Sequence, residues 1–305
     1  MKKVSIITIN FNQIVLTIDL LESLSKQTYS NIELIVVDNG YKNDDSKILK
    51  NYYPNIKLIR SERNLGFAGA NNIGIKNATG ELLFFINNDT IVPQNSIEKL
   101  VQAMSKNCTS GVICPLIVYH NAPSKLQYAG YTKINPITGR NKAIDFKKKM
   151  IIQEKVTLTP YAHGAAMMVT KDIIEKVGFM PENYFLYYEE LDWSKQITGA
   201  GYKIYVYHGC HILHKESMTI GKASPLKVYF QTRNRILFMR RNCNLFQLII
   251  FITFFGLATL PKTIIKYLIG FKIEPIMSFI GGVWWNIIND TGCHSIGFKY
   301  DHINQ

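Results

Sequence analysis

The sequence has few of the features that mark secreted or zinc-binding proteins. Its 305 residues contain five cysteines, which are odd in number, widely scattered and without CxxC spacing. This pattern argues against a disulfide framework and a cysteine zinc site, and it favours a reducing compartment. The apolar run Val4–Ile9 is too short for the core of a signal peptide, so we expect a first strand there.

Acidic residues are also scarce, with 22 Asp and Glu against 35 Lys and Arg, and the net charge is +13. The excess is uneven, because residues 222–305 hold ten Lys and Arg against three acids. A basic and apolar C-terminal third indicates an anionic partner, either nucleic acid or a membrane surface.

The composition is that of a folded protein, since 47% of the residues are hydrophobic and 12% are aromatic. Strand-like and helix-like segments alternate through the first hundred residues, which predicts an α/β fold with a mostly parallel, doubly wound sheet. We expect one domain over 1–221, with its first part at 1–110 and its second at 111–221. A helical, membrane-directed appendage is expected over 222–305.

Polar residues stand at the carboxyl ends of three predicted strands, where ligands of open α/β sheets bind. They are Asn10, Asp38 and Asp89. Asp38 can accept hydrogen bonds from a base or a ribose. Asp89 follows Asn87 and Asn88, and oxygen donors of this kind suit a divalent cation shared with a diphosphate. The competing interpretation of each tip is an ordinary turn.

A glycine- and amide-rich segment, Asn64–Gly74, runs into a predicted helix. Its backbone N–H groups could approach a phosphate, or its small residues could simply pack against a strand. The glycine spacing does not match GxGxxG, which disfavours a nicotinamide site.

Three carboxylates crowd the start of a helix predicted to run to about Thr198. Glu189 and Asp192 share one face of that helix, whereas Glu190 points about 100° away. Acids in a first turn also stabilise the helix dipole, which is the simpler interpretation. The flanking aromatic residues favour a catalytic base, because desolvation raises the basicity of a carboxylate.

The last third changes character. Tyr229–Arg241 is basic, aromatic and helix-prone, and Leu245–Leu260 is an apolar run that we expect Pro261 to end. This run is shorter than the roughly 20 residues of a spanning helix, so the pattern favours segments lying in a bilayer interface. A helical cap on the domain or on a twin subunit is the alternative.

Several of these motifs together resemble glycosyltransferase family 2, and its bacterial rhamnosyltransferase-like members most of all. The resemblance is carried by Thr8-x-Asn10-x-Asn12, Val37-Asp38-Asn39, Asn64-x-Gly66-x-x-Gly69-x-x-Asn72-x-Gly74 and Asn87-Asn88-Asp89. It implies the nucleotide-diphospho-sugar (GT-A) fold and an inverting transfer of sugar.

The same resemblance implies roles for individual residues. The nucleotide-sugar site would comprise Thr8, Asn10, Asn12, Asp38, Asn39, Asn64, Gly66, Asn72 and Asn88. Asp89 would be the metal-binding end of the family's Asp-x-Asp motif, whose first position is Asn87 here. The family's Glu-Asp pair maps onto Glu189-Glu190, which gives Glu190 as the base, with Asp192 as second candidate. His214 matches a histidine that binds the metal or the diphosphate, while we expect His163, His208 and His211 to be structural.

The resemblance implies Mg²⁺ or Mn²⁺ as cofactor, a dTDP- or UDP-sugar as donor, and a glycan or polyprenyl-linked acceptor. We expect a cytoplasmic protein, peripheral on the inner face of the cell membrane, and the sequence leaves open a homo-oligomer. A sugar nucleotidyltransferase, or a non-catalytic membrane or nucleic-acid-binding protein, is the alternative. Strand-tip acids would repel nucleic acid, and no glycine-rich signature follows the first strand.

Overall fold

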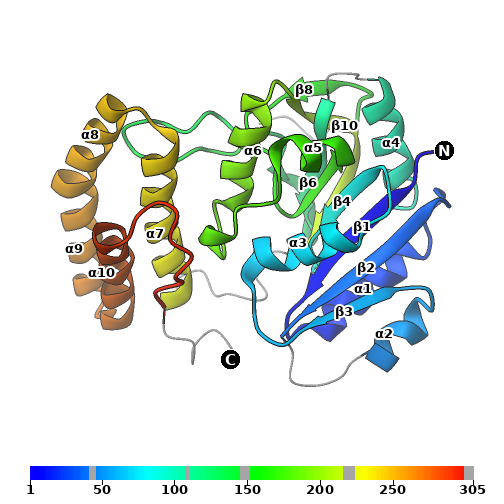
Figure 1. Ribbon diagram of the computed structural model, residues 1–305, viewed down its shortest axis with the longest axis horizontal. Coiled ribbons are helices and arrows are strands. Elements are labelled where there is room, and N and C mark those ends of the chain that lie inside the picture. Colours follow the sequence, from blue (N-terminus) through cyan, green and yellow to red (C-terminus); the bar gives the residue numbers. More distant parts are fainter. Residues whose placement is uncertain (41–45, 107–109, 145–151, 216–223, 299–305) are drawn as a thin grey trace.

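A single large sheet organises the protein in the computed structural model, which describes residues 1–40, 46–106, 110–144, 152–215 and 224–298 (Figure 1). The strand order is β3-β2-β1-β4-β9-β6-β10-β5, with β7 beside β6 and β8 beside β10. The strands are β1 (Val4–Asn10), β2 (Ile32–Asn39), β3 (Lys57–Ser61), β4 (Leu82–Ile86), β5 (Thr90–Ile91), β6 (Ser110–Tyr119), β7 (Ala122–Tyr128), β8 (Val156–Leu158), β9 (Ala166–Thr170) and β10 (Lys203–His214).

The first half of the sheet is parallel and the second half is mixed. β1 pairs in parallel with β2 and β4, and β2 with β3, whereas β9 is antiparallel to both β4 and β6. All five residues of β4 are buried, as expected for a strand covered on both faces. The predicted α/β fold class is confirmed.

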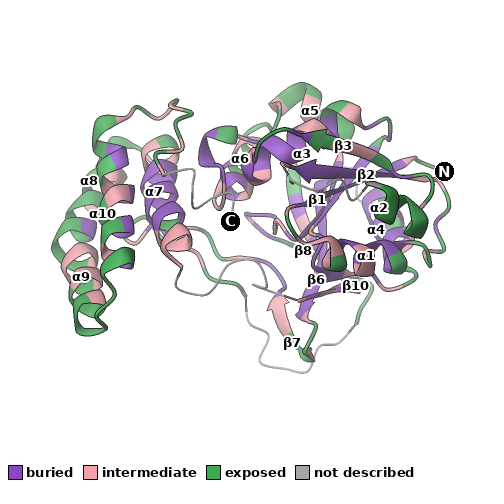
Figure 2. Cartoon of the chain, turned by 90° about the horizontal axis from the view of Figure 1, so that it is seen from below, coloured by how far each residue is buried: buried purple, intermediate pink, exposed green. Residues whose placement is uncertain are grey.

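Helices cover both faces of the sheet, and α1 and α3 lie on opposite sides of it (Figure 2). Right-handed crossovers give this arrangement. The connection from β1 to β2 moves one way across the sheet and the connection from β3 to β4 moves the other way, so their helices lie on opposite faces. The helices of this part are α1 (Ile14–Leu24), α2 (Ser46–Tyr52), α3 (Gly66–Asn77), α4 (Ser96–Lys106), α5 (Lys171–Val177), η1 (Glu182–Tyr184) and α6 (Glu189–Gly199).

The strand β10 is irregular in its middle. A bulge after Tyr207 shifts its register with β6 and lets the strand continue to His214. Its last residues pair with β5, so that His214 lies opposite Thr90. This extension brings a histidine next to the polar tip of β4.

The C-terminal helices form a separate layer at one end of the molecule (Figure 1). The expected stop at Pro261 is wrong, because the helix from Leu245 continues to Ile269. A π-helical turn at Phe255–Thr259 directly precedes the proline, and this wider turn accommodates the ring without ending the helix. The elements are α7 (Pro225–Asn242), α8 (Leu245–Phe254), η2 (Phe255–Thr259), α9 (Leu260–Ile269) and α10 (Ile273–Ile288).

Helix α7 does not lie in an interface as its basic sequence suggested. Most of this helix is buried, namely residues 229, 230 and 232–239. Arg233 among them is 0% exposed. The Arg233 guanidinium lies 3.8 Å from the ring centroid of Trp285 and donates to backbone carbonyls of residues 183, 184 and 295. The basic pattern therefore reflects an internal scaffold rather than a membrane-facing surface.

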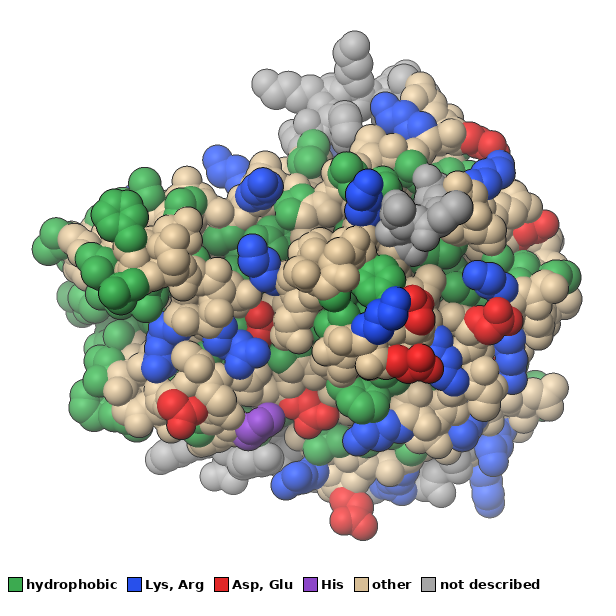
Figure 3. Space-filling model, turned by 45° about the horizontal axis from the view of Figure 1, so that its top comes forward, with side chains coloured by type: hydrophobic (Ala, Val, Ile, Leu, Met, Phe, Trp, Pro, Cys, Tyr) green, Lys and Arg blue, Asp and Glu red, His purple; other side chains and the backbone are tan. Residues whose placement is uncertain are grey.

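An apolar surface covers the outer side of the C-terminal layer, where Figure 3 shows green side chains gathered at one end of the molecule. Helix Leu245–Ile269 is long and apolar enough to cross a membrane, with only 11% of its most apolar window buried. Core helices of soluble proteins pass the same length and hydropathy test, but they are mostly buried. Its large exposed side chains are Leu245, Phe246, Ile249, Ile252, Phe254, Leu257, Ile265, Leu268 and Ile269.

Candidate active site

A buried chain of polar side chains joins the tips of three strands. Asn10 and Asp38 are register partners in β1 and β2, and Asn10 Nδ2 donates to Asp38 Oδ1 at 3.2 Å. The Thr17 hydroxyl donates to Asn10 Oδ1 at 2.8 Å and accepts from Asn88 Nδ2 at 3.1 Å. Since Arg60 Nε lies 3.9 Å from Asp38 Oδ2, the carboxylate at this edge has a cationic neighbour. The structure thus brings Asn10, Asp38 and Asn88 together.

Two asparagines hold the loop that leads into α3. Asn39 Nδ2 donates to Asn64 Oδ1 at 2.9 Å, and Asn39 Oδ1 accepts the backbone N–H of Leu65. Asn64 Oδ1 also accepts the N–H of Gly66 at 2.9 Å. These amides therefore fix the shape of the glycine-containing loop at the same edge of the sheet as Asp38.

The start of α3 is locked to the segment before α6. Phe67 N–H donates to the Phe185 carbonyl at 2.7 Å. Gly66 has φ +71°, and a Cβ added to it would lie 2.2 Å from the Phe185 oxygen. Only glycine fits here, so this contact couples the loop near Asp38 to the acidic helix.

The segment before the acidic helix is strained. Phe185, Tyr187 and Tyr188 all have positive φ values, of 65°, 69° and 75°. Such conformations cost on the order of 1–3 kcal/mol each and persist only where the surroundings impose them. Asn234 supplies part of that restraint, because its Nδ2 donates to the carbonyls of Leu186 and Tyr187 at 2.7 and 2.8 Å.

Two adjacent carboxyls open α6. Glu189 is buried, and burial together with the charge of Glu190 holds its pKa well above the usual range. Burial raises the pKa of Glu190 to about 7. Glu190 Oε2 is buried without a hydrogen-bond partner among the described residues. At neutral pH Glu189 is therefore protonated, and Glu190 is poised to exchange a proton.

Asp192 has a different environment from Glu190. It is 2% exposed, and its two oxygens accept from Arg241 Nε at 2.9 Å and Asn242 Nδ2 at 2.7 Å. Both partners belong to the end of α7. This geometry makes Asp192 a link between α6 and α7 and favours Glu190 as the base.

Asp89 and His214 form a pair at the tip of β4. Asp89 Oδ1 lies 3.1 Å from His214 Nε2, and this buried oxygen has no geometrically aligned hydrogen bond within the described residues. Gln127 Oε1 lies 2.8 Å from His214 Nδ1. Because an amide oxygen only accepts, the Nδ1–H donates to Gln127, and this contact turns Nε2 toward the carboxylate. The pair therefore presents a carboxylate oxygen and a ring nitrogen side by side at the tip of β4.

A row of rings connects this pair to Glu190. The His163 ring lies 6.4 Å from that of His214 and stacks on Tyr131 at 5.8 Å. Tyr131 is close enough to Glu190 for the carboxylate to raise its pKa, after the larger effect of burial. Burial, and then His214, lower the pKa of His163 to about 3, so this imidazole stays neutral. Asp89 and Glu190 are therefore linked through His214, His163 and Tyr131, and these packed rings separate the two carboxylates.

The other predicted site residues have structural surroundings. Asn72 is fully engaged, since it donates to the Met180 carbonyl and Glu182 and accepts from Met180 N–H. Thr8 is 0% exposed, and its hydroxyl has no hydrogen-bond partner within the described part of the chain. Asn12 follows β1 with φ 54°.

Sequence reasoning missed three contributors. Gln127 orients His214 from β7, Tyr131 bridges toward Glu190, and Asn234 restrains the strained segment. None of them belongs to a motif. The Arg233-Asn234-Arg235 triplet was the available signal, because polar residues within an otherwise aromatic helix must be satisfied when the helix is buried.

The model of the family described as glycosyl transferase family 2 matches residues 5–178, more than half of the chain. The chain belongs to glycosyltransferase family 2. This enzyme therefore transfers glycosyl groups, and the family assignment favours that activity over nucleotidyl transfer.

Two curated relatives and one solved structure illustrate the range of similar proteins. Glycosyltransferase AglE of Haloferax volcanii is 28% identical over 63% of this chain and 60% of its own length. An N-acetylglucosaminyl-diphospho-decaprenol L-rhamnosyltransferase of Mycobacterium tuberculosis is 24% identical over 66% of this chain and 72% of its own. A crystal structure of GalNAc-T7 with UDP, GalNAc and Mn²⁺ has a TM-score of 0.60 at 15% identity, covering 86% of this chain and 57% of that one.

The Asp89 and His214 pair fits part of a divalent metal site. Two ligands bound at right angles about 2.1–2.2 Å from an ion lie about 3 Å apart, which matches the observed separation. No group of three or more His, Cys, Asp or Glu side chains suited to a metal occurs among the residues the structure describes. Any further ligands would thus come from water or from a substrate, as is usual for Mg²⁺.

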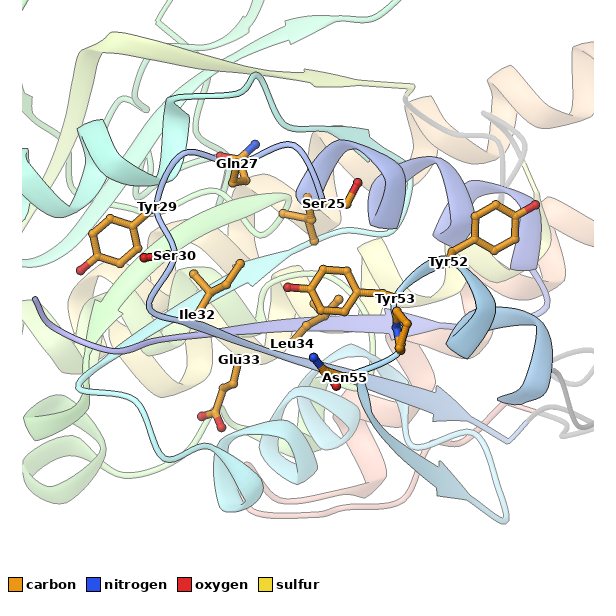
Figure 4. Close-up of a pocket in the computed structure, with 12 residues that line it drawn as sticks. Ser25, Gln27, Tyr29, Ser30, Ile32, Glu33, Leu34, Tyr52, Tyr53 and Asn55 are labelled. Atoms are coloured by element: carbon orange, nitrogen blue, oxygen red, sulfur yellow. The ribbon is translucent and has the colours of Figure 1, made fainter.

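A hollow of about 510 Å³ lies at the opposite edge of the sheet (Figure 4). It is lined by the amino end of β2, from Ile32 to Leu34, and by Tyr52 and Tyr53. Glu33 there is held by Ser5 and Thr79, and these hydrogen bonds lower its pKa to about 2 despite its burial. The fold already satisfies this carboxylate, so Glu33 gives no reason to place the chemistry in this hollow.

Proposed function

We propose that this glycosyltransferase moves a sugar, with inversion, from a nucleotide-diphospho-sugar to a glycan or lipid-linked acceptor. Glu190 carries the proposal. It is a carboxylate with a pKa near neutrality and a buried, unpartnered oxygen, beside a strained segment and linked through packed rings to the Asp89 and His214 pair. Desolvated carboxylates of this kind are suited to general base catalysis.

In the proposed reaction Glu190 takes the proton of the acceptor hydroxyl as that oxygen attacks the anomeric carbon. The bond between this carbon and the diphosphate oxygen breaks on the opposite face, and its electrons leave with the nucleoside diphosphate. Protonated Glu189 leaves Glu190 as the sole base of the adjacent pair. One inversion at the anomeric carbon follows from this single displacement.

The donor would lie along the tips of β1, β2 and β4. Asp38 and Asn10 would receive the nucleoside of a dTDP- or UDP-sugar, and Asp89 with His214 would hold Mg²⁺ or Mn²⁺. A bound divalent ion supplies positive charge that stabilises the leaving diphosphate. The unaligned contact between Asp89 and His214 supports this placement.

We place the enzyme on the cytoplasmic face of the cell membrane, with the exposed side of Leu245–Ile269 toward the bilayer. The low burial of this helix and its exposed large apolar side chains support the placement. A second copy of the chain is the alternative partner for the same surface.

Product analysis tests the proposal. The protein is incubated with UDP- and dTDP-sugars, Mn²⁺ and a lipid extract, and released nucleoside diphosphate is separated from pyrophosphate. We expect nucleoside diphosphate and a glycosylated product. Glu190→Gln should abolish both while retaining donor binding, and Glu154→Gln, at an exposed site, should retain activity. Pyrophosphate as the product, or full turnover by Glu190→Gln, would contradict the proposal.

A further inference from the structure

A second cavity, of about 470 Å³, lies between Glu190 and the C-terminal helices. Its walls come from Tyr187, Tyr188, Glu190 and Leu191 on one side and from Thr263, Tyr267 and Phe279 on the other. Helix α7 contributes Lys227 and Arg235. The cavity therefore connects the proposed base with the layer that carries the exposed apolar surface, and its volume is typical of a ligand site.

The charge of this cavity is strongly positive. Arg140, Lys227 and Arg235 line it, and Glu190 is the only acidic residue that does so. Within the described chain none of the three cations takes part in an ion pair with a carboxylate. Cations facing a cavity without acidic partners favour an anionic ligand.

Arg235 has unused hydrogen-bonding capacity. It is 5% exposed, its guanidinium lies 4.8 Å from the centroid of the Phe255 ring, and its Nε is buried without a partner in the parts of the chain that the structure covers. The ring contact accounts for the burial of the side chain. It does not satisfy the N–H donors, which suit the oxygens of a phosphate.

The fold holds a second arginine beside the first. Gly139 has φ +63°, and a Cβ added to it would lie 3.1 Å from Arg235 Cγ. The Tyr188 hydroxyl donates to the Gly139 carbonyl at 3.2 Å, which fixes the loop that carries Arg140. Burial, followed by repulsion from Arg140, lowers the pKa of Arg235 to about 10, so Arg235 remains charged at neutral pH. Like charges kept together in this way are best explained by an anion between them.

We propose that this cavity binds the diphosphate of a polyisoprenoid-linked acceptor, with Arg140 and Arg235 as phosphate ligands and Lys227 supporting them. The inference rests on the proposed function, because the acceptor sugar then extends toward Glu190. The lipid chain leaves past Thr263 and Tyr267 toward the exposed apolar side of α9. The cavity would thus hold the diphosphate and the acceptor sugar at its polar end near Glu190, and the lipid chain at its apolar end near α9.

Direct binding of farnesyl diphosphate tests the inference without knowledge of the acceptor sugar. Titration calorimetry on the full chain is carried out in EDTA, so that no metal recruits the diphosphate to Asp89, with farnesol as the uncharged probe. We expect farnesyl diphosphate to bind at least about tenfold more tightly than farnesol, as two charge-assisted contacts allow.

Variants locate the site. Arg140→Gln removes an exposed side chain and Arg235→Lys keeps a buried charge, so both should fold, and each should weaken farnesyl diphosphate binding about tenfold or more with farnesol unchanged. Lys266→Gln, an exposed cation outside the cavity, and Asp38→Asn, at the proposed nucleoside site, should leave binding unchanged.

The outcomes separate the two proposals. Equal affinity for farnesyl diphosphate and farnesol, or unchanged affinity in both arginine variants, overturns the inference even if nucleotide sugars are turned over. Selective binding that depends on the arginines, in a chain that releases no nucleoside diphosphate from any donor, supports this site and contradicts the proposed function instead.

Discussion

Asn234 Nδ2, on helix α7, donates to the carbonyl oxygen of Tyr187 at 2.8 Å. The same nitrogen lies within hydrogen-bond distance of the carbonyls of Tyr184 and Leu186. One buried amide thus restrains the backbone that delivers Glu189 and Glu190. The catalytic geometry proposed here therefore depends on helix α7 as well as on the acidic segment itself.

Replacing this amide should therefore damage catalysis more than its effect on stability implies. Asn234→Ala leaves up to three buried carbonyls without their donor, for a loss of about 1–3 kcal/mol in unfolding free energy. We expect kcat to fall at least about tenfold as Glu190 loses its position. Asn286→Ala removes a comparable buried amide that donates to the Arg233 and Gly282 carbonyls. Equal losses of kcat in the two variants, measured alongside thermal unfolding, would contradict this role.

The contact between Gly66 and Phe185 predicts that adding one methyl group at Gly66 lowers the free energy of unfolding. Gly66→Ala places Cβ against the Phe185 oxygen at a positive φ, so backbone strain alone should cost about 1–3 kcal/mol. Gly199→Ala is the matched control, because nothing lies within 4 Å of its added Cβ and its φ is not in the strained range. Denaturant unfolding of both variants provides the measurement, and a neutral Gly66→Ala would show that α3 and the acidic segment are not coupled.

The pH dependence should report Glu190. Its pKa of about 7 means that the carboxyl is protonated and inactive as a base below neutrality and ionised above it. We expect kcat/KM to rise about tenfold per pH unit up to a pH of about 7 and then to level off. His163, with a pKa of about 3, adds no step in this range. A flat profile from about pH 5.5 to 8.5 in a single buffer series would exclude Glu190 as the rate-determining base.

Metal dependence should follow the pair at the tip of β4. Asp89→Asn and His214→Gln should each raise the Mn²⁺ concentration needed for half-maximal activity, and Gln127→Leu should do so by about 10–100-fold through the orientation of His214. His208→Gln serves as control, because that ring contacts Thr157 instead. An Mn²⁺ titration in which the Asp89, His214 and Gln127 variants all match the native protein and the His208 control would remove the metal from this position.

The exposed face of the C-terminal helix should govern membrane binding. Leu257 is 79% exposed there, so Leu257→Asp should reduce flotation with liposomes of anionic phospholipid without loss of fold. Val15→Asp changes an apolar residue on α1 that is 67% exposed, and it should have no effect. If the native protein fails to float but forms dimers in light scattering that Leu257→Asp disrupts, then a second copy rather than a bilayer covers this face.

The parts of the fold set by local pattern were predictable from the sequence. The buried apolar runs of β2 and β4, each ending in polar residues, gave the parallel sheet and the edge where Asp38 and Asp89 stand. Parallel strands present their carboxyl ends at one edge, so the placement of these tips follows from the class of fold.

The parts set by long-range packing were not predictable. Charge in α7 suggested a membrane surface, but Arg233 finds its partners among carbonyls about 50 residues earlier and an aromatic ring about 50 residues later. Pro261 suggested a helix end, yet the helix continues past it because a π-helical turn at Phe255–Thr259 accommodates the proline ring. Asp192 and Glu190 are two residues apart in one acidic cluster, and only the positions of Arg241 and Asn242 separate their roles.

The burial of α7 has a practical consequence for anyone preparing this protein. Truncating the chain at residue 221 to improve solubility would remove Asn234, whose amide donates to the Tyr187 carbonyl. It would also remove α10, whose Asn286 donates to the Arg233 carbonyl. A shortened version of that kind would be expected to precipitate or to lack turnover, which could be mistaken for a wrong choice of donor. Substituting polar residues for the exposed apolar ones on α8 and α9 keeps these buried hydrogen bonds. It is the safer route to a detergent-free sample.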